Sequence, residues 1–222
     1  MLWAIDWFPI KLSLVVATAA TLIALVFGAA VAWLLARRRF FGRDFVDAIV
    51  SLPLVLPPTV LGYYLLVLMG TRTALGGFLF DRFRIRLTFT VFAAIVAATI
   101  HSFPLVVKSL RAAFESVDPG LEEAARTLGL GPLKVFLRVT LPIAERGVLA
   151  ATALAFARAL GDFGITIMIA GNIPGKTQTV SVAIYDAVQA GRDNEAFTLS
   201  VIVSVIAVAL LYLINRLGRF RF

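Results

Sequence analysis

Long apolar runs separated by shorter polar segments dominate the hydrophobicity pattern of this chain. Five of these runs approach or exceed the length that an α-helix needs to cross a membrane, about 20 residues. They cover residues 10–35, 45–69, 87–107, 147–170 and 197–214. The first run is longer than the apolar core of a signal peptide, and no small-residue cleavage site follows it. The pattern therefore predicts an all-α membrane protein with about five transmembrane helices, in a single domain over residues 1–222.

The composition agrees with a membrane protein. Hydrophobic residues make up 60% of the chain and charged residues 15%, compared with about 45–50% and about 25% in a soluble domain. A net charge of +8 would also suit a nucleic-acid-binding protein, but such a protein carries its charge on a soluble surface that is scarce here. With one histidine and no cysteine, a Cys/His metal site and thiol chemistry are excluded.

The basic residues indicate an orientation in the membrane. Most of the 21 basic residues follow the first, third and fifth apolar runs. These residues are Arg37, Arg38, Arg39, Arg43, Lys108, Arg111, Arg126, Lys134, Arg138, Arg146, Arg216, Arg219 and Arg221. Because cytoplasmic loops are enriched in Lys and Arg, we expect these segments in the cytoplasm, the N-terminus outside and the C-terminus inside. Arg82, Arg84 and Arg86 run against this pattern.

The longest predicted loop, residues 108–146, contains the signals of a short helix. Asp118 is a favourable N-cap, and Pro119 suits the first helical position. Gly129 can adopt the positive φ that often ends a helix. These signals predict a helix over Pro119–Leu128. The alternative is an unstructured surface loop, although short connections usually suffice between neighbouring helices.

A second helix is expected to start at Pro132 and to end at Pro142. Its apolar face, at i, i+3, i+4, i+7 spacing, would consist of Leu133, Phe136, Leu137 and Thr140. A short helix held out of the membrane by an amphipathic one can dock into a groove on another protein.

This loop resembles a signature, E-A-A…G…I-x-L-P, found in permease subunits of binding-protein-dependent ABC importers. The matching positions are Glu123, Ala124, Ala125, Gly129, Val139, Leu141 and Pro142. Val139 replaces the usual isoleucine, and the resemblance extends from the first apolar run to the fifth. It implies the type I ABC importer permease fold, in which this loop forms a coupling helix that sits in a cleft of a cytoplasmic ATPase subunit. The coupling residues implied in this way are Glu122, Glu123, Ala124, Ala125, Arg126, Leu128 and Gly129.

The same resemblance implies partners and a location. The permease would form a homodimer in a bacterial or archaeal cytoplasmic membrane, above two ATPase subunits and below an extracytoplasmic binding protein. ATP and magnesium would be used by the ATPase subunits, whereas this chain would bind no cofactor and catalyse no reaction.

Residues 161–179 resemble the corresponding segment of molybdate permeases, and sulfate permeases carry a related version. The resemblance implies a tetrahedral oxyanion as substrate, with molybdate favoured and tungstate, sulfate or thiosulfate as alternatives. Residues 170–177 also match a relaxed P-loop pattern. However, Ala170 stands where the strict motif has glycine, and Pro174 lacks a backbone N–H. We therefore do not interpret this segment as a nucleotide site.

Several polar residues lie within the apolar runs. Arg158 and Asp162 are four residues apart, so they would share a helix face and form an ion pair that braces the bundle. A role of this pair in transport is the alternative, since ionisable groups in a membrane are often functional. We interpret His101 as a hydrogen-bonded packing residue rather than as a ligand.

Prolines interrupt the second apolar run at Pro53, Pro57 and Pro58. A broken helix at membrane depth either is buried or lines a cavity, and its new N-terminus can face an anion. A simple packing kink is the alternative. The candidate pathway residues are Pro57, Pro58, Thr59, Ser102 and Thr166.

Two other classes of membrane protein fit this sequence less well. An intramembrane enzyme is disfavoured because the G-x-S-x-G and H-E-x-x-H motifs are absent and Asp162 is the only carboxylate deep within a run. A passive channel would not need a capped helix in a long cytoplasmic loop.

Overall fold

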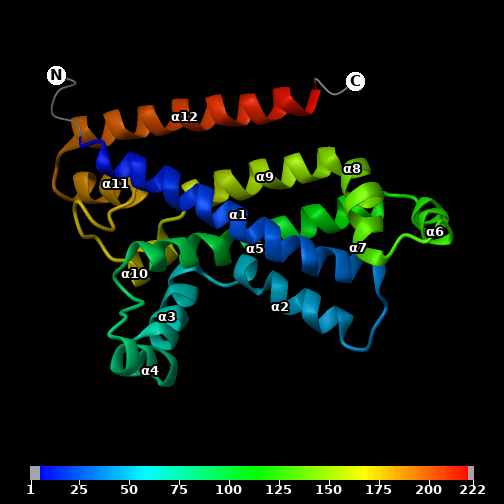
Figure 1. Cartoon of the computed structure of the whole chain (residues 1–222). Coiled ribbons are helices and arrows are strands. Elements are labelled where there is room, and N and C mark those ends of the chain that lie inside the picture. Colours follow the sequence, from blue (N-terminus) through cyan, green and yellow to red (C-terminus); the bar gives the residue numbers. More distant parts are fainter. Residues whose placement is uncertain (1–5, 220–222) are drawn as a thin grey trace.

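The computed structural model describes residues 6–219 of the chain, and every regular element in this part is helical. The elements in chain order are α1 (Phe8–Arg37), α2 (Arg43–Val55), α3 (Pro58–Met69), α4 (Ala74–Phe83), α5 (Val91–Glu115), α6 (Pro119–Thr127), α7 (Pro132–Val135), the π-helical segment η2 (Phe136–Thr140), α8 (Leu141–Ile143), α9 (Glu145–Leu160), α10 (Gly164–Ile169), α11 (Val180–Gln189) and α12 (Asp193–Arg219). The molecule is elongated, with α6 at one end and α10, α11 and α4 toward the other (Figure 1).

Three of the predicted spans are long continuous helices. Helices α1, α5 and α12 are each long and apolar enough to cross a membrane. They confirm the first, third and fifth predictions. Helix α5 also continues to Glu115, well into the predicted loop, because Leu110 and Phe114 extend its buried apolar face. The loop between the membrane helices is therefore shorter than expected.

The predicted break in the second span is confirmed. Helices α2 and α3 meet at an angle of 110°. Leu56 and Pro57 have extended backbones there, as expected for residues that precede a proline, and Pro58 occupies the first turn of α3. Pro53, in contrast, remains inside α2.

The prediction of a continuous fourth span over residues 147–170 is wrong. Helix α9 ends at Leu160, and α10 is a separate short helix that starts at Gly164. The 16 residues of α9 correspond to only about 24 Å of helix, less than the thickness of a bilayer core. The residues before α9 form a second helical segment, which is bent relative to it by 79°.

The second amphipathic helix is only partly as expected. Its start at Pro132 is confirmed, but Pro142 lies in the first turn of α8 and does not end the segment. The backbone widens instead into η2, where the N–H of Leu141 bonds to the carbonyl of Phe136. Of the expected apolar face, Thr140 is buried but Leu133 and Leu137 are exposed, and Val135, outside that face, is buried.

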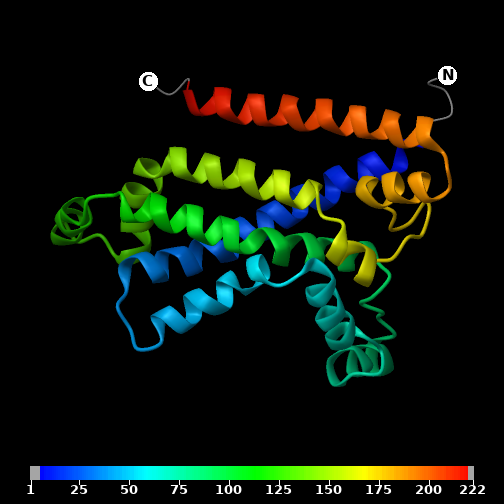
Figure 2. The same cartoon turned by 180° about the vertical axis from the view of Figure 1, so that it is seen from behind.

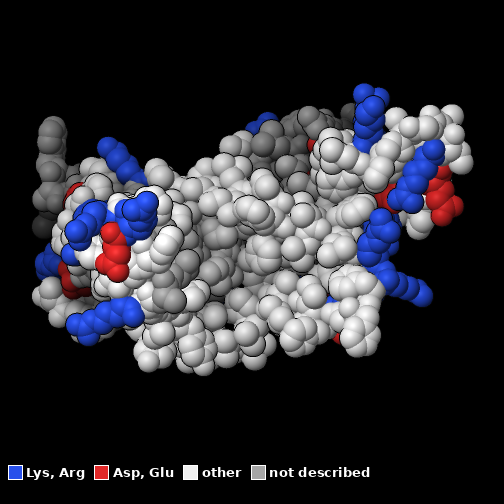
Figure 3. Space-filling view, turned by 60° about the horizontal axis from the view of Figure 1, so that its bottom comes forward, with Lys and Arg blue, Asp and Glu red and all other residues white. Residues whose placement is uncertain are grey.

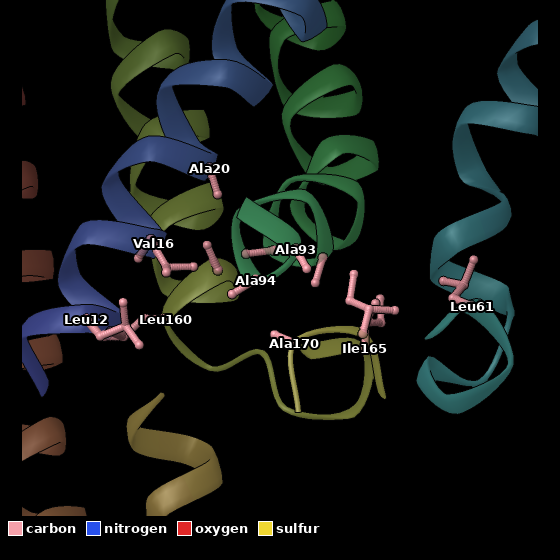
Figure 4. Packing of buried hydrophobic residues seen from close by; sticks show 14 of the residues in the cluster. Leu12, Val16, Ala20, Leu61, Ala93, Ala94, Leu160, Ile165 and Ala170 are labelled. Atoms are coloured by element: carbon pink, nitrogen blue, oxygen red, sulfur yellow. The ribbon is translucent and has the colours of Figure 1, made fainter. Parts of the chain in front are cut away.

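Small residues allow the three central helices α1, α5 and α9 to pack closely. A Cβ atom added to Gly28 of α1 would lie 2.8 Å from a methyl carbon of Val106 in α5. One core cluster joins Leu12, Val16 and Ala20 of α1 to alanines of α5 and to residues of α9 and α10 (Figure 4). Small side chains at such contacts favour helix association in a membrane, where close packing is the main attraction.

Helix α12 lies at the edge of the bundle and is mostly exposed (Figure 2). It contacts the rest of the chain through a small cluster that includes Ile10, Val180 and Leu199, and its Val203 and Ala207 pack against the main cluster. Helices α4 and α11, which the search for long apolar runs did not predict, are ten residues long each. Charged side chains gather at the two ends of the molecule and leave an uncharged band between them (Figure 3), as expected for a protein that crosses a membrane.

Candidate coupling and translocation sites

The predicted capped helix is confirmed as α6. The side chain of Asp118 accepts a hydrogen bond from the N–H of Gly120 at 2.8 Å, and Pro119 occupies the first turn. Gly129 has a φ of +84°, and the following N–H, of Leu130, returns to the carbonyl of Ala125. Gly129 therefore reverses the chain in a conformation that a residue with a side chain rarely adopts.

Glu122 anchors α6 to the rest of the chain. Its Oε1 atom accepts hydrogen bonds from Arg37 Nε at 3.1 Å, Arg37 Nη2 at 2.8 Å and Thr140 Oγ1 at 2.6 Å. The Nη2 of Arg37 also donates to the carbonyl of Val117 at 3.0 Å. We call Arg37, Glu122 and Thr140 the Glu122 clamp. It links α6 to the end of α1 and to η2.

Two of the expected coupling residues face inward. Glu122 is 3% exposed and Ala125 is 7% exposed, so neither side chain is available to a partner subunit. This corrects the expectation for both, and their spacing of three residues explains why they share the inner face of α6. The remaining residues are exposed and form what we call the docking surface: Glu123, Ala124, Arg126, Leu128 and Gly129.

The predicted Arg158–Asp162 ion pair is replaced by a network that passes through His101. His101 Nδ1 lies 2.5 Å from Asp162 Oδ1, and Arg158 Nη2 contacts His101 Nε2. The two charged side chains do not pair directly because α9 ends before Asp162. A guanidinium can only donate, so Nε2 must accept and Nδ1 must carry the proton toward Asp162. The expectation that His101 is a hydrogen-bonded packing residue is confirmed.

Asp162 also organises the start of α10. Its Oδ2 atom accepts from the backbone N–H of Thr166 at 3.1 Å and from the Thr166 hydroxyl. An aspartate at this position compensates the unpaired N–H groups of a helix start. The network therefore connects α5, α9 and α10.

Of the five candidate pathway residues, two are internal. Thr166 is bonded to Asp162, and the hydroxyl of Ser102 donates to the carbonyl of Ala98 at 2.8 Å. Both side chains are buried, so in this conformation neither hydroxyl faces an open pathway. Pro57, Pro58 and Thr59 are exposed at the break between α2 and α3.

The starts of α3 and α10 touch each other. A Cβ added to Gly164 would lie 2.7 Å from the Cβ of Pro58, and one added to Gly62 would lie 2.7 Å from the Cβ of Met168. The two chain breaks, one after α2 and one after α9, therefore meet at a junction that only small residues permit.

The loop that resembles a P-loop has no free phosphate cradle. The N–H groups of Lys176, Thr177 and Gln178 all point to the carbonyl of Ile173, at 3.1, 2.9 and 3.2 Å. A short helix, α10, precedes this loop where a P-loop would follow a strand. Asn172 instead ties the loop to α11, with its side-chain nitrogen 2.8 Å from Asp186 Oδ1.

Sequence reasoning missed Arg37 and Thr140 as partners of Glu122. Arg37 is one of three consecutive arginines, and its charge was interpreted only as a marker of orientation. Eighty-five positions separate Arg37 from Glu122, and no local signal connects residues so far apart. The bridging position of His101 was missed for the same reason.

Residues 24–220 match the family model described as "Binding-protein-dependent transport system inner membrane component". The chain is 45% identical to the molybdenum transport system permease protein ModB of Escherichia coli K12, over 96% of this chain and 94% of that protein. It is 38% identical to the sulfate transport system permease protein CysT of Salmonella typhimurium, over 93% of this chain and 74% of that protein.

A solved structure supports the fold. The chain matches a chain of the bacterial alginate ABC transporter in complex with an alginate pentasaccharide-bound periplasmic protein, with a TM-score of 0.74 and 18% identity. The match covers 96% of this chain and 77% of that chain. The capped helix in the loop, the broken helices and these similarities agree. The chain belongs to the family of inner membrane components of binding-protein-dependent transport systems and has the type I ABC importer permease fold.

Proposed function

We propose that this chain is the permease subunit of an ABC importer for a tetrahedral oxyanion, most specifically molybdate. The observation that carries the proposal is the 45% identity to a molybdenum permease over nearly the full length of both chains. Sulfate is the second candidate, because the sulfate permease is 38% identical but is covered over a smaller share of its length.

The proposed complex contains two copies of this chain, each forming one transmembrane domain, together with two cytoplasmic ATPase subunits and an extracytoplasmic binding protein. In it, ATP and magnesium are used by the ATPase subunits, and this chain is not catalytic. The basic residues after the first, third and fifth spans support a cytoplasmic C-terminus and an N-terminus outside.

The docking surface of α6 is the proposed contact with the ATPase. When ATP draws the two ATPase subunits together, each would move the α6 seated in it. The Glu122 clamp supplies a path for this motion, because Arg37 belongs to α1 and Thr140 to the segment that leads into α9. The helices would then alternate between states open to either side of the membrane.

Reconstitution with the cognate ATPase and binding protein in lipid vesicles tests the proposal. We expect ATP hydrolysis to rise several-fold with binding protein loaded with molybdate and less with sulfate. Binding protein loaded with tungstate, an oxyanion of the same charge, shows how selective this stimulation is for molybdate. Stimulation by sulfate alone would overturn the molybdate assignment, and substantial ATP hydrolysis by the purified chain alone would overturn the permease assignment.

A further inference from the structure

An apolar hollow opens on the surface of α1 near its end at Arg37. Its volume is about 460 Å³, within the range of small-molecule sites, about 300–1,000 Å³. The lining residues are Val26, Ala29, Ala30, Trp33, Pro132, Leu133 and Phe136. The hollow thus lies between α1 and the segment α7–η2, with apolar side chains on every side.

A second hollow lies beside the first one and is basic. It is lined by Trp33, Arg37, Arg38, Arg126, Leu130 and Pro132. Trp33 and Pro132 line both hollows, so the apolar and the basic parts are neighbours.

The charge in the basic part is only partly compensated. The guanidinium of Arg37 is held by Glu122 at 2.8 Å, and that of Arg126 lies farther from Glu122, at 3.8 Å, with its side chain half exposed. Arg38 is exposed, and no ion pair is recorded for it within residues 6–219. The guanidinium groups of Arg38 and Arg126 can therefore both donate hydrogen bonds to an anionic ligand.

We propose that these two neighbouring hollows together bind one anionic phospholipid, with acyl chains in the apolar hollow along α1 and the phosphate at Arg38 and Arg126. The apolar part extends from Trp33 to Val26, about 10 Å of helix toward the middle of the span. The arginines mark the membrane surface on the side where we place the cytoplasm, where anionic lipids and basic pockets attract each other. Trp33 lies at the boundary, as tryptophan does in membrane interfaces.

The site goes beyond the proposed function because it concerns the lipid rather than the transported anion. Its two walls belong to different parts of the chain, α1 and the segment beside the coupling helix. A bound lipid would therefore support the position of α7 relative to α1.

Native mass spectrometry of the full chain, delipidated in detergent, tests the site. The probes are phosphatidylglycerol and phosphatidylcholine, added separately. We expect several-fold higher retention of phosphatidylglycerol, and several-fold loss of this preference in Arg38→Gln. Arg39→Gln is the matched control, since Arg39 is the exposed neighbour that does not line the hollow. Equal retention of both lipids, or equal loss in both variants, would overturn the proposal.

A second pair of variants tests the apolar part. Ala30→Phe places a ring in the hollow and should reduce phosphatidylglycerol retention several-fold. Leu22→Phe, on an exposed position of the same helix, should leave it unchanged. If Ala30→Phe retains the lipid fully, the acyl chains do not occupy this hollow. If the ATPase displaces the lipid from the wild-type chain, the hollow is a protein docking site and the proposal is wrong. Lipid retention needs no transport, so this test is independent of the proposed function.

Discussion

At the scale of single residues, the buried charges of this protein are compensated by long-range partners. Asp162 receives bonds from His101 and from Thr166, and Arg158 reaches the other nitrogen of the same imidazole. Arg158 and Asp162 are not adjacent on one helix. The imidazole of His101 therefore bridges the guanidinium in α9 and the carboxylate that precedes α10. In the Glu122 clamp, the buried carboxylate of Glu122 is likewise paired with a residue far away in the chain, Arg37.

The network predicts the effect of removing one charge. Asp162→Asn should remove the negative charge that His101 links to Arg158, and losing the charged partner of a buried hydrogen bond typically costs about 1.5–3 kcal/mol. The double variant Arg158→Gln/Asp162→Asn removes both charges and should recover much of the loss. Thermal unfolding in detergent measures the stability of both variants, and anion uptake in vesicles measures their transport. If the double variant assembles normally but transports nothing, the network is part of transport and not only a brace.

At the scale of elements, the broken helices define the architecture. Helices α2 and α3 separate at Pro57 and Pro58, and α9 and α10 separate at residues 161–163. The two breaks come together because Gly164 has no side chain to meet Pro58. The start of α3 is exposed, whereas Asp162 already bonds to the start of α10, so of the two helix starts only that of α3 can face an anion.

Replacing Gly164 tests this junction. Gly164→Ala would place its Cβ 2.7 Å from the Cβ of Pro58, which forces α3 and α10 apart at a typical overpacking cost of about 1–3 kcal/mol. We expect a lower unfolding midpoint and reduced uptake. Gly161→Ala is the control, because a Cβ there would meet only the Ala157 carbonyl at 3.5 Å. Equal effects of both variants would contradict the importance of the contact.

At the scale of the whole molecule, the docking surface and the candidate pathway lie far apart. Helix α6 is at one end, whereas α3 and α10 lie toward the other (Figure 1). If α6 is the contact with the ATPase, as we propose, motion that begins there would have to travel along the central helices. The close packing of α1 against α5 makes such rigid transmission possible, because tightly packed helices move as units.

Because the docking surface is exposed, a substitution there should weaken assembly with the ATPase without changing the stability of the chain. Leu128 is 84% exposed at the tip of α6, so Leu128→Asp should leave thermal unfolding unchanged while weakening ATPase binding by tenfold or more, about 1.4 kcal/mol. Co-purification with the ATPase measures the loss. Phe41→Asp, at another fully exposed apolar position, should bind the ATPase normally. Unchanged binding of the Leu128 variant would show that α6 is not the contact.

The sequence alone determined the features that depend on local pattern and composition. Apolar run length identified the three continuous spans, the paired prolines identified the break after α2, and Asp118 with Gly129 identified α6, because caps and turns act within a few residues. A signature of this local kind also carried the resemblance to ABC importer permeases.

Only the tertiary structure decided which side chains meet. It divided the fourth run at Gly161, turned Glu122 and Ala125 inward, widened the turn before Pro142 and placed His101 between Arg158 and Asp162. Each of these features depends on contacts between residues far apart in the chain. Hydrophobicity and spacing indicate that a charge in a membrane needs a partner, but the packing of helices determines which partner it finds.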